Sequence, residues 1–282
     1  MKKVSKIFMI LVLIFLYLPI VILIVASFNT SADIARLSGF TFAQYTALFQ
    51  DSALLPLLGN SLIVAALSSL IATVMGTMAA LGIYSMRGKL RSLALTVTNI
   101  PLTNPDIVTG VSLALVFVFV GRALRINNVL GFTTLLIAHI SFNLSYVILA
   151  VLPKLTQMDK NLRDAALDLG CTPLQAFFKV IFFEILPGII SGALLSFAMS
   201  LDDFVISYFV YGPSFVTLPV EIYNYTKKPL HPKIYALFTV LFAAILLIMV
   251  LMNILEALDA KRTRNIRKTG NSERGVKFEK IL

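Results

Sequence analysis

The sequence has little charge, few histidines and a single cysteine. Only 13% of its 282 residues are charged and 58% are hydrophobic, whereas an ordinary soluble domain has about 25% charged residues. One cysteine excludes a disulfide scaffold, and two histidines argue against a histidine-based metal site. The apolar content excludes intrinsic disorder, and a soluble globule of this composition would expose large apolar patches. The chain is therefore predicted to lie in a membrane.

Six stretches are apolar and long enough to cross a bilayer as helices, which takes about 20 residues. They are predicted at 7–28, 61–83, 105–121, 133–152, 185–207 and 234–255. The first stretch is longer than the about 7–15 apolar residues of a signal peptide, and no A-x-A cleavage site follows it. We therefore expect an uncleaved first span and an all-α protein whose residues 1–282 form one transmembrane domain with six helices.

Basic residues are distributed unevenly between the two sides of these spans. With the N-terminus inside, 18 of the 24 Lys and Arg residues fall in cytoplasmic segments and six fall outside. Because Lys and Arg concentrate on the cytoplasmic side, both termini are predicted to be cytoplasmic. The basic tail, 256–282, is expected to rest against the anionic headgroups of the lipid bilayer. It has no interleaved aromatic residues, so we expect no nucleic-acid partner.

Small residues recur at every fourth position on two predicted spans. The second span carries Ser68, Ala72, Gly76 and Ala80, and the fifth carries Gly188, Gly192, Ser196 and Ser200. Small side chains let membrane helices approach closely, so both faces are expected to contact other helices. On the fourth span His139 and Asn143 share a face, where interhelical hydrogen bonds are expected rather than a metal.

Prolines and glycines mark the connections between spans. Pro101 and Pro105 before the third span indicate either a helix broken at membrane depth or a simple entry from a loop. On the outside, Gly39–Phe49 is predicted to form a short amphipathic helix on the membrane surface. Gly212–Lys233 contains four prolines and is predicted to be an irregular loop.

Three aspartates, Asp106, Asp202 and Asp203, fall within or at the edge of predicted spans, where a charge costs about 2.5–3.5 kcal/mol. Asp203 continues the small face of the fifth helix, and Asp202 points about 100° away from it. Adjacent carboxylates disfavour each other's ionisation unless water or a cation screens them. They are therefore predicted to face an aqueous cavity or a cationic partner. The alternative is local capping at the interface, which for Asp106, at a helix start, is equally supported.

The inside segment 153–183 is too charged to cross a membrane, and its residue pattern indicates an ordered structure rather than an irregular loop. A helix is predicted over Asn161–Leu169, and Gly170 ends it. Thr172 and Pro173 then begin a second helix as N-cap and first helical residue. The pattern predicts a helix–turn–helix elbow, either a lever against a soluble partner or a well-ordered connector.

This elbow carries a recognisable motif. Asp164-Ala165-Ala166 followed by Gly170 resembles the EAA loop of ABC importer permeases, whose pattern is Glu-Ala-Ala, three residues, Gly, nine residues, then Ile-x-Leu-Pro. The chain departs from the pattern twice. Asp164 replaces the Glu, and Val180–Phe183 stand in place of Ile-x-Leu-Pro, with a proline four residues later at Pro187.

Further motifs narrow the resemblance to the C-type membrane subunit of the spermidine/putrescine (polyamine) ABC importer family. They are Ser200–Phe204, Gly212–Ser214, Leu218–Tyr223, Ser141-Phe142 and Asn104–Ile107. The resemblance covers nearly the whole chain and implies the type I, MetI-like permease architecture in a bacterial inner membrane. It also implies a heterodimer with a second permease subunit, two cytoplasmic ATPase subunits and an extracytoplasmic solute-binding protein.

The same resemblance implies roles for particular residues. Those implied to couple the permease to the ATPase are Asp164, Ala165, Ala166, Gly170, Thr172 and Pro173. The acidic residues implied to meet the polyamine are Asp106, Asp202 and Asp203.

No phosphate-binding loop of the G-x-x-x-x-G-K-[ST] type is present, since the only Gly-Lys pair, Gly88-Lys89, is followed by Leu90. ATP and magnesium are therefore expected to bind partner subunits, and no cofactor is expected in this chain. Three alternatives stay open. Asp106 and Asp203 could form the pair of an intramembrane protease, although no Gly-x-Gly-Asp motif is present. The chain could be an ATP-independent secondary transporter or channel, or carry another solute such as thiamine, an iron complex or a phosphonate.

Overall fold

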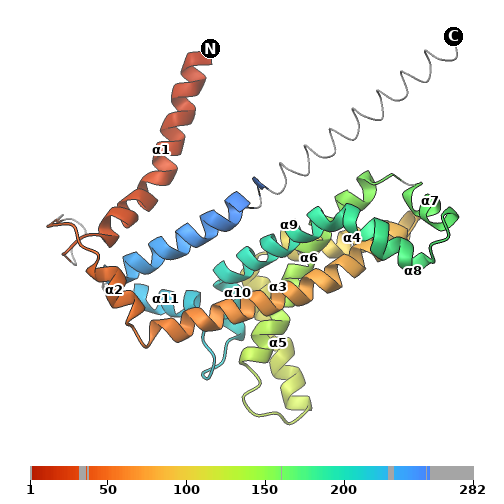
Figure 1. Ribbon diagram of the computed structural model, residues 1–282. Helices are drawn as coiled ribbons and strands as arrows, with labels where there is room; N and C mark the ends of the chain where they lie inside the picture. The colour runs from red at the N-terminus through yellow and green to blue at the C-terminus, as the bar shows by residue number, and fades with distance from the viewer. Residues whose placement is uncertain are drawn as a thin grey trace. The chain divides into compact units, whose positions relative to one another are not determined.

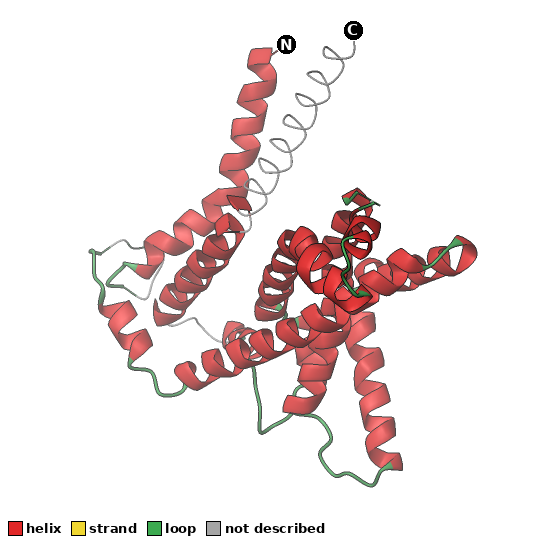
Figure 2. Ribbon diagram, turned by 45° about the vertical axis from the view of Figure 1, so that its right-hand side comes forward, coloured by secondary structure: helices red, strands yellow, loops and turns green. Residues whose placement is uncertain are grey.

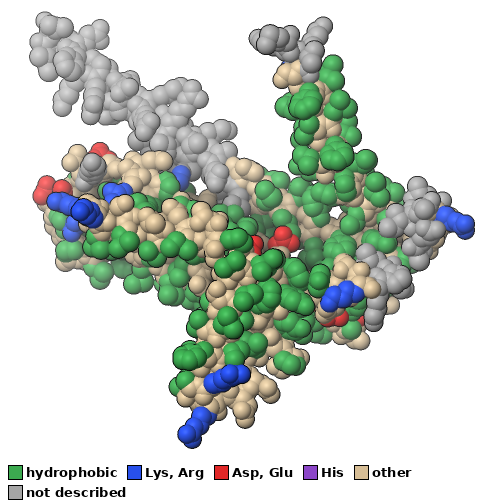
Figure 3. All heavy atoms as spheres, turned by 180° about the vertical axis from the view of Figure 1, so that it is seen from behind, with side chains coloured by type: hydrophobic (Ala, Val, Ile, Leu, Met, Phe, Trp, Pro, Cys, Tyr) green, Lys and Arg blue, Asp and Glu red, His purple; other side chains and the backbone are tan. Residues whose placement is uncertain are grey.

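The computed structural model describes residues 2–31, 36, 38–159, 161–227, 232–251 and 253–254. Within these ranges the regular structure is helical, apart from two isolated bridges, Asn29↔Phe40 and Gly212↔Phe215 (Figure 1, Figure 2). Six helices are long and apolar enough to cross a membrane, as the sequence predicts. On the face shown in Figure 3, hydrophobic side chains are exposed on many parts of the described surface, with few charged side chains among them. The predicted basic tail, 256–282, lies outside the described residues.

The chain divides into two compact units, residues 1–60 with 217–247 and residues 61–216 with 248–282. The first unit contains α1 (Lys2–Ser27), α2 (Ala43–Phe49), the start of α3 (Leu54–Ser85), α11 (Leu218–Thr226) and most of the last helix, Pro232–Leu251. Apolar side chains form its core, namely Leu48, Leu54, Leu218, Ile234, Ala236 and Leu237. The short helix predicted at Gly39–Phe49 is present as α2, which begins later, at Ala43.

The prediction of an irregular loop over Gly212–Lys233 is wrong, because α11 occupies Leu218–Thr226. Pro219 lies in the first turn of this helix, where the missing N–H has no intrahelical partner to lose. Pro232 likewise begins the last helix. These prolines therefore mark helix starts rather than irregular backbone.

Asp51 and Lys233 form an ion pair in the first unit. The Asp51 carboxylate also accepts hydrogen bonds from the backbone N–H groups of Ala53 and Leu54, at 2.9 and 3.2 Å, at the start of α3. The hydrogen bond from Lys233 lowers the pKa of Asp51 below its ordinary value, and partial burial opposes the shift. The pair holds the start of α3 against the start of the last helix.

The second unit contains the rest of α3 and the helices from α4 to α10. Their bounds are α4 (Gly88–Thr103), α5 (Asp106–Ala123), α6 (Phe132–Gln157), α7 (Leu162–Asp168), α8 (Pro173–Ala176), a π-helical turn at Phe177–Ile181, α9 (Phe182–Asp202) and α10 (Val205–Val210). Helix α6 is the most buried of the six candidate spans. It packs along α9, and α7 and α8 lie at one end of this pair (Figure 1).

Both predicted small-residue faces pack against α6. A Cβ atom added at Gly188 would lie 2.7 Å from Cγ of Lys154, and one at Gly192 would lie 3.2 Å from Cβ of Ala150. On α3, a Cβ atom at Gly76 would lie 2.8 Å from Cβ of Val147. Small residues at these positions let the three helices approach closely, as membrane helix packing requires.

Two features of the second unit differ from the sequence prediction. Helix α4 precedes the third span, in a segment for which no helix was predicted, and none of its residues is fully buried. The predicted fifth span, 185–207, is divided: α9 ends at Asp202, Asp203 has extended backbone with ψ 117°, and α10 starts at Val205. No proline or glycine stands at this break, so none of the usual residue signals for the end of a helix predicts it.

Candidate functional site

A cavity of about 230 Å³ lies between two interruptions of the helices in the second unit. One interruption separates α4 from α5 at Asn104–Pro105, and the other separates α9 from α10 at Asp203–Phe204. The residues that line the cavity are Pro101, Asp106, Phe142, Tyr146, Met199, Asp202, Asp203, Phe204, Val205 and Ile206. The three aspartates selected from the sequence thus line a single cavity, although Asp106 comes from α5 and the other two from the end of α9.

Asp106 enters the cavity from the first interruption. Pro105 restricts the residue before it to extended backbone, and Asn104 has ψ 137°, so α4 ends there. Asp106 is the first residue of α5, where a negative charge suits the helix dipole, and it is exposed. The side chain is therefore both well placed at a helix start and open to the cavity.

Asp202 and Asp203 have different surroundings at the second interruption. Asp202 is exposed, whereas the side chain of Asp203 is only 9% exposed. The Asp203 carboxylate accepts hydrogen bonds from the backbone N–H groups of Ile206 and Ser207, at 3.3 and 2.8 Å. Asp203 therefore caps the start of α10 and also borders the cavity. Asp202 is more open to the cavity.

Aromatic side chains complete the lining, and sequence reasoning missed their part in it. Phe142 and Tyr146 come from α6, four residues apart, and Phe204 comes from the α9–α10 break. Tyr146 lies seven residues after His139, a spacing that places both on one helix face and that the sequence already contained. Aromatic faces and carboxylates both attract ammonium groups, so the lining suits an organic cation.

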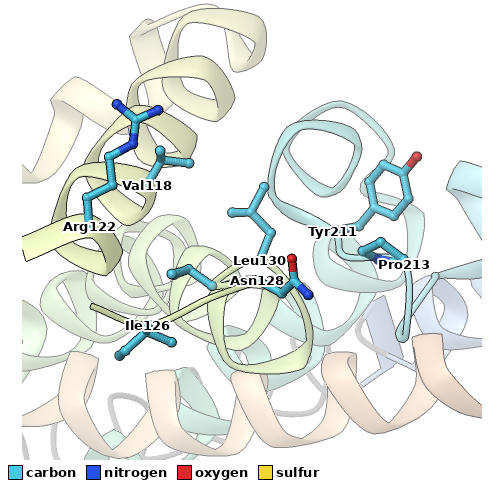
Figure 4. Close-up of a pocket in the computed structure, with 8 residues that line it drawn as sticks. Val118, Arg122, Ile126, Asn128, Leu130, Tyr211 and Pro213 are labelled. Carbon is cyan, nitrogen blue, oxygen red and sulfur yellow. The ribbon is translucent and has the colours of Figure 1, made fainter. Parts of the chain in front are cut away.

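A second cavity, of about 310 Å³, has the opposite charge. Its lining residues are Val118, Arg122, Ile126, Asn128, Val129, Leu130, Tyr211 and Pro213. In Figure 4 Arg122 extends from the last turn of α5, and Tyr211 and Pro213 lie across the cavity. The guanidinium of Arg122 would repel an ammonium group. This cavity therefore suits a cation less well than the acidic one.

The elbow has the local structure that its sequence predicts. Gly170 has φ +84°, and its N–H donates to the carbonyl of Leu167 while that of Cys171 donates to the carbonyl of Ala166, at 2.9 and 3.1 Å. This pair of bonds is the glycine-ended helix stop that left-handed backbone permits. Thr172 then caps α8 through reciprocal hydrogen bonds with Gln175.

The elbow joins the ends of the long helices around a cavity of about 430 Å³. Its lining comes from α3, α6, α7, α8 and the following helical turn, and consists of Leu81, Tyr84, Ser85, Leu155, Met158, Arg163, Asp164, Pro173, Phe177 and Ile181. Ala166 is buried, whereas Asp164 and Ala165 are exposed. Added atoms at Gly170 would meet open space. A force on this exposed surface would therefore act on the ends of α3, α6 and α9.

The described ranges contain no group of three His, Cys, Asp or Glu side chains that could hold a metal ion. The arrangement offers carboxylates and aromatic faces in a cavity. Such an arrangement is chemically suited to an organic cation.

Comparison with known proteins places these features in a family. Residues 72–265 match the family described as "Binding-protein-dependent transport system inner membrane component". The putrescine transport system permease protein PotI of Escherichia coli strain K12 is 37% identical over 234 residues, which cover 82% of this chain and 83% of that protein. The spermidine/putrescine transport system permease protein PotC of the same strain is 36% identical over 252 residues, covering 89% of this chain and 93% of that protein.

Solved structures share the fold. A chain of a bacterial ABC transporter involved in the import of the acidic polysaccharide alginate superposes with a TM-score of 0.70 at 17% identity, covering 92% of this chain and 94% of that chain. A chain of the MetNI methionine ABC transporter superposes with a TM-score of 0.55 at 18% identity, covering 76% and 95%. The protein is a multi-pass membrane protein with the all-α, MetI-like permease fold, and it belongs to the family of binding-protein-dependent transport system inner membrane components.

Proposed function

We propose that this chain is the membrane-spanning permease subunit of an ATP-driven importer that carries polyamines, spermidine or putrescine, into the cell. The observation that carries the proposal is the cavity that gathers Asp106, Asp202 and Asp203 at two helix breaks. A polyamine carries several ammonium groups, each of which needs a counter-charge when it leaves water. The names of PotI and PotC, relatives that match most of the chain, support the same cargo.

Two parts of the proposal, inward transport and ATP as the source of energy, are based on the elbow, which resembles the EAA loop of ABC importer permeases. A cytoplasmic ATPase subunit docks on the surface formed by the exposed residues Asp164, Ala165, Gly170, Thr172 and Pro173. Ala166 is buried and packs the first helix of the elbow beneath that surface. Two such subunits bind ATP and magnesium, and this chain itself hydrolyses nothing. When the ATPases close, they move the exposed elbow, which is joined to the ends of α3, α6 and α9.

The remaining features of the assembly follow from the same proposal. Both termini and the elbow lie on the cytoplasmic side of a bacterial inner membrane, because 18 of the 24 basic residues then face inward. A second permease subunit completes the path across the membrane. A solute-binding protein delivers the polyamine from outside, and the cavity accepts it when the assembly is open outward.

Uptake of labelled spermidine and putrescine tests the proposal. Cells that lack the gene are complemented with the natural sequence or with an empty vector, in a background without other polyamine importers. We expect uptake of at least one polyamine to return with the natural sequence and to stop on ATP depletion with the membrane potential maintained.

Two results would contradict this. Equal uptake by complemented and deleted cells means that the cargo is wrong, and the family then points to another solute. Uptake that survives both ATP depletion and Gly170→Leu means that the chain is a secondary transporter or channel.

A further inference from the structure

A chain of buried polar side chains runs through the second unit to the acidic cavity. His139 lies on α6, with Nδ1 2.6 Å from the hydroxyl of Ser200 on α9 and Nε2 2.9 Å from that of Ser207 on α10. The imidazole therefore bridges the two helices that the break separates. His139 is 1% exposed, so its hydrogen bonds form away from water.

The chain extends in both directions from the imidazole. On one side Ser200 lies 3.0 Å from the hydroxyl of Ser68 on α3, and the amide of Asn143 donates to Ser68 at 3.3 Å. On the other side Nε2 lies 3.5 Å from Oδ2 of Asp203. This arrangement confirms the interhelical hydrogen bonds expected of His139 and Asn143.

One placement of hydrogens accounts for the hydrogen bonds that link these side chains, and it leaves the buried Oδ1 of Asn143 without a partner among the described residues. The Asn143 amide donates to Ser68, Ser68 donates to Ser200, and Ser200 donates to Nδ1 of His139. A neutral imidazole then carries its proton on Nε2 and donates toward Ser207, whose hydroxyl hydrogen-bonds the Asp203 carboxylate. Each of these donations between side chains points toward the carboxylate, so they polarise one another in favour of the negative charge. The Ala65 carbonyl, 3.3 Å from the Ser68 hydroxyl, competes for the proton of Ser68.

We propose that His139 is a positioning residue for the bound cation. Through Ser207 it holds the Asp203 carboxylate at the edge of the cavity, and through Ser200 and Ser207 it fixes α10 relative to α9. The inference rests on the proposed function and adds to it the residue that sets how tightly the cavity holds an ammonium group. Neither a metal nor a catalytic step is involved.

The geometry also explains why a histidine is used here. Asp203 already accepts two backbone N–H groups, so its position depends on where α10 begins. The planar imidazole ring contacts α9 through one nitrogen and α10 through the other, so it sets the position of the start of α10 relative to α9. An amide side chain reaches only one side: Asn places its oxygen near the position of Nδ1, where it can accept from Ser200, and Gln places its nitrogen near that of Nε2, where it can donate to Ser207.

This difference supplies matched variants. His139→Gln retains the hydrogen bond toward Ser207 and Asp203, whereas His139→Asn retains only the one toward Ser200. Ser207→Ala breaks the same link without changing the ring. The measurement is the dissociation constant of labelled spermidine for the purified complex with its partner subunits in lipid nanodiscs, without the solute-binding protein. Omitting that protein matters because its own affinity would otherwise dominate.

We expect His139→Asn and Ser207→Ala to raise the dissociation constant at least about tenfold, the loss of one hydrogen bond to a charged group. His139→Gln should remain within about threefold of the natural protein. The amount of assembled complex is measured for each variant, and the dissociation constant refers to the assembled complex alone. A purely structural role would instead lower the amount of complex and leave the dissociation constant of the remainder unaltered.

Failure of the inference differs from failure of the proposed function. Equal dissociation constants for the Asn and Gln variants and the natural protein overturn the inference while polyamine uptake by cells stands. Absence of spermidine binding by the natural complex overturns the inference as well. Absence of uptake by cells carrying the natural sequence overturns the proposed function and the inference together.

Discussion

The two interruptions that border the acidic cavity are held in different ways. At Asn104–Pro105 the proline ring restricts the backbone and ends α4, and the exposed Asp106 begins α5. At Asp203–Phe204 no such residue is present, and the break is held by side-chain hydrogen bonds from His139, Ser200 and Ser207. A break made by proline is local and persists when its neighbours change. A break made by hydrogen bonds depends on three helices at once.

A third interruption, at the elbow, is held by glycine. Gly170 adopts left-handed backbone, which costs other residues about 1–2 kcal/mol. Each of the three interruptions is therefore sensitive to a different substitution. The first is sensitive to replacement of the proline, the second to loss of a hydrogen-bond partner, and the third to addition of a Cβ atom at the glycine.

The largest effect should come from a change that separates the two cavity-forming breaks. A Cβ atom at Gly110 on α5 would lie 2.9 Å from Cδ2 of Phe209 and 3.2 Å from Cα of Ile206 on α10. Gly110→Leu should therefore force α5 from α10 and lower polyamine uptake more than about tenfold, since overpacking costs about 1–3 kcal/mol or more. The control is Gly82→Leu on α3, where a Cβ atom meets nothing within 4 Å. Equal losses for both variants would contradict the packing argument.

The next effect distinguishes the two adjacent aspartates. Asp203→Ala removes the cap of α10 and should lower thermal stability, since a lost cap costs about 0.5–2 kcal/mol. Asp203→Asn keeps one of the two oxygens that accept from the N–H groups of Ile206 and Ser207, so its melting temperature should fall less. Asp202→Ala should leave the melting temperature of the purified complex unchanged, because its side chain is exposed. If Asp202→Ala destabilises as much as Asp203→Ala, the assignment of separate roles is wrong.

At the elbow, the variants separate backbone strain from loss of the docking surface. Gly170→Asn should support more uptake than Gly170→Ala, because asparagine tolerates left-handed backbone better. Gly170→Leu should lower uptake the most, because its side chain would project from the exposed surface on which the ATPase subunit is proposed to dock. Uptake and basal ATPase activity are measured together, and loss of uptake with retained ATPase activity indicates uncoupling. The reverse order, with Asn below Ala, would contradict the role of the φ angle.

The smallest effect concerns a carboxylate outside the cavity. Asp51 is already paired with Lys233, which lowers its pKa. A carboxyl group with a lowered native pKa stabilises the fold above its ordinary pKa, and that contribution disappears as the pH falls through the lowered value. Asp51→Asn should therefore reduce the melting temperature by a few degrees or less at pH 7. The difference from the natural protein should narrow as the pH falls below the ordinary range for aspartate. A difference that is independent of pH would contradict the ion-pair account.

What the sequence predicted depended on how each feature is encoded. The spans follow from the length of apolar stretches, the end of the first elbow helix from the conformational freedom of Gly170, and the start of the second from Thr172-Pro173. Each of these signals is local in sequence, so each could be predicted without knowing the fold. The break at Asp203 depends on His139 and Ser207, which are distant in sequence from one another. The lining by Tyr146 required knowing which face of α6 meets the cavity.

The most direct test of the account compares the two cavities. The dissociation constant of labelled spermidine is measured for the purified complex in nanodiscs, with the natural chain, with Asp202→Asn and with Arg122→Gln. We expect at least about a tenfold rise in the dissociation constant for Asp202→Asn, because an ammonium group loses a charged hydrogen-bond partner. We expect no weakening for Arg122→Gln, because Arg122 lines the other cavity. Unchanged binding by Asp202→Asn, or an equal loss for Arg122→Gln, would contradict the claim that the acidic cavity holds the ammonium groups.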